Sequence, residues 1–121
     1  MRNEHDLANR FYENAISLSE FGISGFAWKW ECISIVLNYL KNNNYAILGG
    51  DVYRLENDQI DITYDSWFSN KKDNMSWEFY VDESNKRAME YINNYYERNG
   101  NDYCYSLVIS KTKEPVDWGN R

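Results

Sequence analysis

The sequence predicts an α+β fold: an antiparallel sheet of about four strands with about three helices packed mainly on one face. Apolar residues recur at helical spacing over residues 4–43, and from about residue 45 they alternate with polar ones. The predicted strands are mostly adjacent in sequence, which favours an antiparallel sheet with segregated helices. With 121 residues and no internal repeat or linker, we expect a single domain over 1–121, with loose ends at 1–3 and about 112–121.

Two amphipathic helices are predicted at the start of the chain, over residues 4–18 and 28–43. The second is the clearer pattern, because Ile33 and Leu37 belong to an apolar stripe opposite a polar one. Between the helices, residues 21–25 hold two glycines three positions apart and are expected to form a turn. A run of three asparagines is expected to end the second helix, since asparagine tolerates the left-handed conformation of a helix C-cap.

The periodicity then changes to that of β-strands. Residues 45–48 and 52–55 are expected to be strand, interrupted at Gly49-Gly50 by a β-bulge or a close backbone approach. A turn at residues 56–58 leads into a strand over 59–65, where apolar and polar residues alternate. This pattern is typical of a half-exposed antiparallel hairpin.

The remaining residues are expected to add a strand, a helix and a closing strand. Alternation over residues 77–82 predicts the first of these. A helix is expected over 83–98, capped by Asp82 or Ser84 and followed by a glycine just beyond its end. The closing strand is expected over 103–110.

Negative charge is concentrated in the middle of the chain. The formal net charge is −6, and residues 51–82 hold eight acids against three bases, which accounts for −5 of it. Such a stretch is either a solvated surface that maintains solubility or a face that attracts a basic partner and speeds its capture. Direct binding of nucleic acid is disfavoured, because phosphate contacts need clustered lysine and arginine.

The sequence carries no residue set typical of an enzyme or a metal site. His5 is the only histidine and lies near the N-terminus, and the two cysteines are far apart. Asp61 and Asp65 share a face of the predicted strand but lie about 13 Å apart along it. Glycosidase carboxyl pairs are separated by roughly 5–10 Å, although either residue could pair with Asp51 or Glu78 from a neighbouring strand. We therefore expect no catalysis, no cofactor and no bound metal.

The expected location is the cytoplasm. No secretory signal is visible, and no apolar run reaches the length of a membrane span, so no membrane partner is expected. Cys32 and Cys104 lie in apolar settings without a CxxC pattern. We expect them to be buried, reduced thiols, as in other proteins of a reducing compartment.

Aromatic residues interleave with the acids over residues 51–80, which is typical of a surface that binds a basic protein. Trp and Tyr are common anchors of protein interfaces, and complementary charge sets the rate of encounter. The alternative is that Tyr64, Trp67 and Trp77 belong to the core face of the sheet. The residues predicted to bind a partner are Asp51, Tyr53, Asp61, Asp65, Trp67 and Glu78.

The run of residues 47–53, ILGGDVY, and the later run 64–67, YDSW, resemble a family of bacterial polymorphic-toxin immunity proteins, the fortieth of the immunity-protein series. The resemblance covers roughly residues 13–111. It implies a cytosolic antidote, encoded beside a secreted or contact-delivered toxin, that blocks this toxin by binding it. The residues that match the motif are Gly49, Gly50, Asp51, Val52, Tyr53, Tyr64, Asp65 and Trp67.

The leading hypothesis is neutralisation of a cognate toxin by stoichiometric binding. An acidic inhibitor suits a basic toxin such as a nuclease, which carries lysine and arginine for phosphate. One alternative is a small regulatory or adaptor domain whose sheet edge binds another protein. Another is a hydrolase or small-ligand binder that uses Asp51, Asp61 or Asp65.

Overall fold

The computed structural model of the chain describes residues 12, 14–23, 25–111 and 116–117. The elements in chain order are β1 (Ile16–Ser17), the 3-10 helix η1 (Leu18–Phe21), β2 (Phe26–Lys29), α2 (Trp30–Asn42), β3 (Ala46–Glu56), β4 (Gln59–Phe68), α3 (Trp77–Asn99), β5 (Tyr103–Tyr105), β6 (Val108–Ser110) and β7 (Val116–Asp117).

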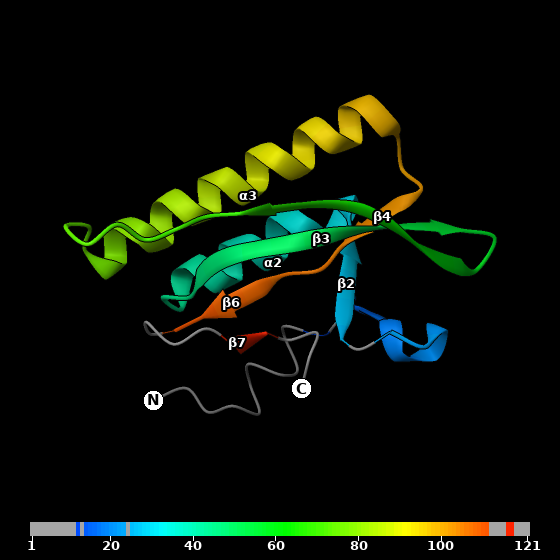
Figure 1. Cartoon of the computed structure of the whole chain (residues 1–121), viewed down its shortest axis with the longest axis horizontal. Coiled ribbons are helices and arrows are strands. Elements are labelled where there is room, and N and C mark those ends of the chain that lie inside the picture. Colours follow the sequence, from blue (N-terminus) through cyan, green and yellow to red (C-terminus); the bar gives the residue numbers. More distant parts are fainter. Residues whose placement is uncertain (1–11, 13, 24, 112–115, 118–121) are drawn as a thin grey trace.

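The α+β prediction is confirmed, and the described residues form more strands and fewer α-helices than were expected for the chain. Within the described residues, seven strands form one sheet in the order β1-β2-β5-β3-β6-β7, and β4 pairs with the other edge of β3. All the strand pairs are antiparallel. The helices α2 and α3 lie on the same side of the sheet (Figure 1), as the predicted layering requires.

The strand β3 is the centre of the sheet and confirms the expected irregularity at its two glycines. The two predicted segments form one strand, whose register shifts against β6 between Ile47 and Gly49. The backbone also makes a close approach here, because a Cβ atom at Gly50 would overlap the carbonyl oxygen of Ser106 and the ring of Trp67. Glycine is therefore required at Gly50 by packing.

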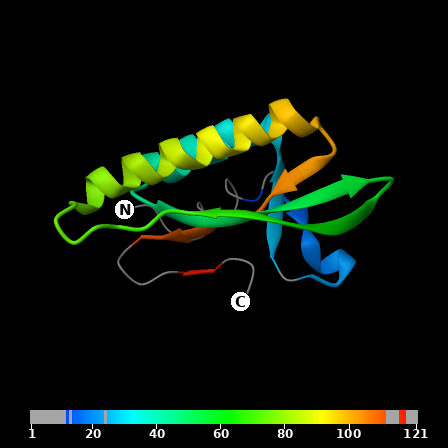
Figure 2. The same cartoon turned by 45° about the horizontal axis from the view of Figure 1, so that its top comes forward.

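The β3–β4 hairpin is closed by a two-residue turn. Asn57 and Asp58 have φ of 54° and 61°, the left-handed conformation that favours asparagine and aspartate in tight hairpins. β4 continues to Phe68, three residues beyond the predicted strand. Both views show the tip of this hairpin extending past the C-terminal end of α3 (Figures 1 and 2).

The helix predicted over residues 4–18 is wrong over its described part, where β1 and η1 stand instead. Residues 1–11, including His5, lie outside the described residues. The Leu18 amide donates to the Gly25 carbonyl at 2.9 Å, and the Leu18 carbonyl accepts from Ile23 at 3.1 Å. These hydrogen bonds fold the segment back on itself. Burial of Leu18 in this arrangement stabilises it more than the weak helical preference of a short segment would stabilise a helix.

The second predicted helix is confirmed as α2, but its expected first residues belong to β2. Trp28 and Lys29 pair with Tyr105 and Cys104 of β5. Trp28 is almost fully buried there. An apolar run directly before a helix fits either element, and the partner strand decides between them.

The strand predicted over residues 77–82 is wrong, because this segment is the first part of the 23-residue helix α3. Neither Asp82 nor Ser84 caps the helix: the Ser76 side chain accepts a hydrogen bond from the Phe79 amide at 3.1 Å. Ser84 instead accepts from the Ile47 amide at 2.9 Å and so ties the helix to β3. The helix ends at Gly100, the expected glycine.

The closing strand is confirmed with a break at Ser106 and Leu107, which divides it into β5 and β6. Both pieces pair with β3 on the edge opposite β4. At the break, the Ser106 amide donates to the Asp51 carbonyl at 2.9 Å and keeps the two strands in contact. Of the predicted loose C-terminal end, the structure describes β7, which pairs with β6.

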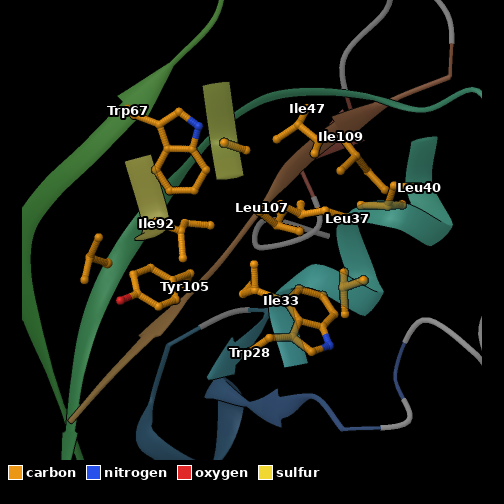
Figure 3. Packing of buried hydrophobic residues seen from close by; sticks show 13 residues of the cluster. Trp28, Ile33, Leu37, Leu40, Ile47, Trp67, Ile92, Tyr105, Leu107 and Ile109 are labelled. Carbon is orange, nitrogen blue, oxygen red and sulfur yellow. The ribbon is translucent and has the colours of Figure 1, made fainter. Parts of the chain in front are cut away.

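The main core fills the space between the sheet and the two α-helices. Its buried members come from α2, α3, five strands and the break between β5 and β6 (Figure 3). The labelled side chains of this core are Trp28, Ile33, Leu37, Leu40, Ile47, Trp67, Ile92, Tyr105, Leu107 and Ile109. A smaller cluster around Leu18, Ala27 and Cys104 covers part of the opposite face, since Cys104 and Tyr105 are neighbours in β5 and point to opposite sides.

Candidate partner-binding surface

The β3–β4 hairpin concentrates negative charge on a strand that has one free side. Residues 46–68 contain five acids and a single base, Arg54, whose guanidinium pairs with Glu56. Among the strands that the structure describes, β4 pairs with β3 alone. No described strand pairs with its outer edge, where Arg87 of α3 binds the Phe68 carbonyl, and strand edges are common sites of association.

β4 also exposes large apolar side chains. The exposed fractions of Ile62, Tyr64 and Phe68 are 55%, 90% and 66%. Asp61 directly precedes Ile62, Asp65 directly follows Tyr64, and both are exposed. We call these five residues the β4 surface. Apolar side chains bordered by charged ones make up the usual composition of a protein interface.

The pairing of β3 with β4 is irregular around Tyr64. Asp51 is in register with Ser66 and Tyr53 with Ile62, so Val52 alone faces residues 63–65 across the ladder. Tyr64 has φ of 67°, which is rare for an aromatic residue. Extra residues in a strand bend it and change the direction of its side chains.

The side chain of Thr63 closes this irregularity. Its hydroxyl donates to the Val52 carbonyl at 2.7 Å and accepts from the Asp65 amide at 3.0 Å. The two bonds hold both sides of Tyr64, which keeps the strained backbone in one conformation.

Two side chains of α3 hold β4 from the helix side. The hydroxyl of Tyr95 donates to Oδ2 of Asp65 at 2.8 Å, and Nε of Arg87 donates to the Phe68 carbonyl at 2.7 Å. Burial, and after it the hydrogen bond to Asp65, raise the pKa of Tyr95 to about 12. Tyr95 therefore remains a hydrogen-bond donor at neutral pH.

The predicted partner-binding residues occupy three different settings. Asp51, Asp61, Asp65 and Glu78 are exposed, while Tyr53 is half-buried against the smaller cluster. Trp67 is 4% exposed and stacks on Tyr91, with ring centroids 4.9 Å apart.

The structure does not bring Glu78 next to the hairpin tip. Glu78 lies in the first turn of α3. This turn is at the opposite end of the β3–β4 ladder from the Asn57–Asp58 turn (Figure 1). Asp61 lies near that tip, in register with Arg54. The exposed acids thus extend along the ladder and form no single cluster.

Sequence reasoning missed Ile62 and Phe68 and left Tyr64 out of the predicted contact residues. The alternation over residues 59–65 placed Tyr64 on the same face as Ile60, with core as an alternative. In the structure Tyr64 is 90% exposed, so it does not belong to the core. The only signal in the sequence was the YDSW run itself, which contains Tyr64 and Asp65.

The described residues offer contact surface and little enclosed space for chemistry. No group of three or more His, Cys, Asp or Glu side chains gathers among them in a way that would hold a metal ion. An open hollow of about 690 Å³ lies between α2 and α3, and a smaller one of about 220 Å³ lies beside the two glycines of β3. No helix in the described ranges is long and apolar enough to cross a membrane.

A comparison with protein families finds a match for most of the chain. The family model described as Immunity protein 40 matches residues 17–109. No curated protein and no solved structure matches the chain.

Proposed function

Because the chain belongs to the Immunity protein 40 family, whose model matches residues 17–109, we propose that it neutralises a cognate toxin by binding it one to one. In this proposal the chain acts by occupying the toxin and catalyses no reaction. Its place of action is the cytoplasm, where it meets the toxin before or after delivery. The toxin is the product of a neighbouring gene.

The observation that supports this proposal is the combination of exposed apolar and acidic side chains on the β4 surface. Ile62, Tyr64 and Phe68 offer apolar area that nothing in the described chain covers. Burial of such area supplies most of the affinity of protein complexes, and a few aromatic residues dominate it. Trp67 contributes from beneath, because its buried ring supports β4 without being exposed itself.

The acids of the hairpin define the chemistry of the partner. Five acids against one base give residues 46–68 a formal charge of −4. We propose that Asp51, Asp61 and Asp65 face cationic side chains of the toxin, with Tyr53 beside them and Glu78 adding charge at the far end. A nuclease presents such cations, since it must bind phosphate.

Charge reversal at Asp61 and Asp65 together tests the placement of the surface. We expect the double variant Asp61→Lys/Asp65→Lys to associate with the toxin domain of the neighbouring gene about tenfold more slowly at low salt, because it loses electrostatic steering. Stopped-flow association kinetics measure this. The difference should shrink as ionic strength rises, because salt screens exposed charges.

The matched control reverses two acids outside the hairpin, Glu31 of α2 and Glu83 of α3, and so changes the net charge by the same amount. Glu31→Lys/Glu83→Lys should associate at nearly the wild-type rate. Equal slowing in both double variants would show that net charge alone matters, and the placement on β4 would be wrong.

A further inference from the structure

Tyr64 combines two features that the packing of the described residues does not explain. Its side chain is 90% exposed, and its backbone has φ of 67°, a conformation that costs free energy for any residue with a bulky side chain. Because the ring is exposed, its packing within the domain does not offset the free energy of the strained backbone. Strained residues persist where the surrounding structure enforces them, and they gather at functional sites.

We propose that Tyr64 is the anchor of the complex, with its ring inserted into an apolar pocket of the toxin that has cationic side chains at its rim. The inference rests on the proposed function and names the residue on which the affinity depends. The ring supplies a rigid apolar body with a polar tip, the composition of a typical hot spot. Asp61 and Asp65 stand on either side of it in β4, which contains no base.

Asp65 has a second task, which is to position Tyr64. Its carboxylate accepts the hydrogen bond from Tyr95, and its amide donates to Thr63. These bonds fix the residue that directly follows Tyr64 to α3 and to Thr63, whose hydroxyl in turn binds Val52 of β3. A contact residue that is already held in its bound conformation loses less entropy on binding, which raises affinity.

The anchor is tested with substitutions that keep the backbone. Asparagine tolerates the left-handed conformation, so Tyr64→Asn removes the ring without adding strain. We expect this variant to bind the toxin domain of the neighbouring gene about 100-fold more weakly, mainly through faster dissociation. Its thermal unfolding midpoint should equal or exceed that of the wild type. Tyr64→Phe, which retains the ring, should stay within about fivefold of wild-type affinity.

The matched control is Ile35→Asn, which removes an apolar side chain 70% exposed on α2. It should leave the dissociation constant unchanged. Surface plasmon resonance gives both rate constants for each variant. If Tyr64→Asn binds as tightly as a wild-type chain that does bind, the anchor is overturned and the proposed function stands. If the wild type does not bind the toxin domain, the proposed function itself is overturned.

The positioning task is tested at high salt, where the charge of Asp65 is screened. Asp65→Asn retains an oxygen acceptor for Tyr95 and should keep wild-type affinity within about threefold. Asp65→Ala and Tyr95→Phe should each dissociate about tenfold faster, and the two changes together should cost no more than either alone. Wild-type dissociation in Tyr95→Phe would overturn this part of the inference.

Discussion

Asp61 and Asp65 carry the same charge in different surroundings. Asp61 is exposed near the hairpin tip, whereas the carboxylate of Asp65 is bound by the Tyr95 hydroxyl at 2.8 Å. A substitution at Asp61 therefore changes mainly the electrostatic field. A substitution at Asp65 also changes the structure around Tyr64. We therefore expect substitutions at Asp61 to change mainly the association rate, and substitutions at Asp65 to change the dissociation rate as well.

The two cysteines have unequal access to solvent. Both are free; Cys104 is fully buried and Cys32 is half-buried. Burial raises the pKa of the Cys104 thiol to about 12. Burial and, after it, the charge of Glu31 also raise the pKa of Cys32.

We therefore predict that a thiol reagent at pH 8 modifies Cys32 first and slowly, and leaves Cys104 unmodified until the protein unfolds. The reacting species is the thiolate, which is scarce at both sites at this pH. Reaction kinetics of Cys32→Ser and Cys104→Ser assign the two phases. Rapid modification of Cys104 in the native protein would contradict the packing of the smaller cluster.

At the scale of the elements, the packing of β3 against its neighbours requires glycine at Gly50. Gly50→Ala should lower the free energy of unfolding by about 2–3 kcal/mol, because the added methyl group overlaps the Ser106 carbonyl and the Trp67 ring. Urea denaturation measures the change.

Gly22→Ala provides the comparison for Gly50→Ala. Gly22 has φ of 83° and open space around its Cβ position, so only backbone strain of about 1 kcal/mol is expected there. A loss at Gly50 no larger than the loss at Gly22 would argue against the close approach of the strands.

Sequence reasoning correctly placed the elements whose apolar pattern continues over many residues and whose ends are marked by characteristic residues. The stripe containing Ile33 and Leu37 fixed α2, and the two glycines of β3 fixed its irregularity. Residues 77–82 misled it because six alternating residues also fit two turns of a helix. In the structure Tyr80 and Val81 are both buried, a spacing that only a helix allows here.

The sequence predicted the negative charge of the candidate site but did not predict the exposure of Tyr64. Exposed Asp61 and Asp65 follow from composition and alternation. The outward direction of Tyr64 depends on three β4 residues facing Val52 and on bonds from Thr63 and from Tyr95 of α3. The bond from Thr63 spans 11 residues and the bond from Tyr95 spans 30, so no local pattern encodes them.

At the scale of the whole molecule, α3 contacts the acidic hairpin over part of its length, and the tip of the hairpin lies beyond the helix. α2 and α3 cover one face of the sheet, and the hairpin tip extends beyond α3 (Figure 2). A rigid core thus carries a strand edge that presents charge and apolar area together. This arrangement suits a protein that binds a partner with little change of its own shape.

Titration of the toxin's activity with the purified chain tests most directly whether the protein acts by occupancy. With the toxin domain well above the dissociation constant, its activity should fall linearly and reach zero at one equivalent of the chain. The inhibited mixture should contain intact toxin, and its activity should return when the complex is dissociated. Complete inhibition by a small fraction of an equivalent, with progressive modification or cleavage of the toxin, would show that the chain is a catalyst and would contradict the account.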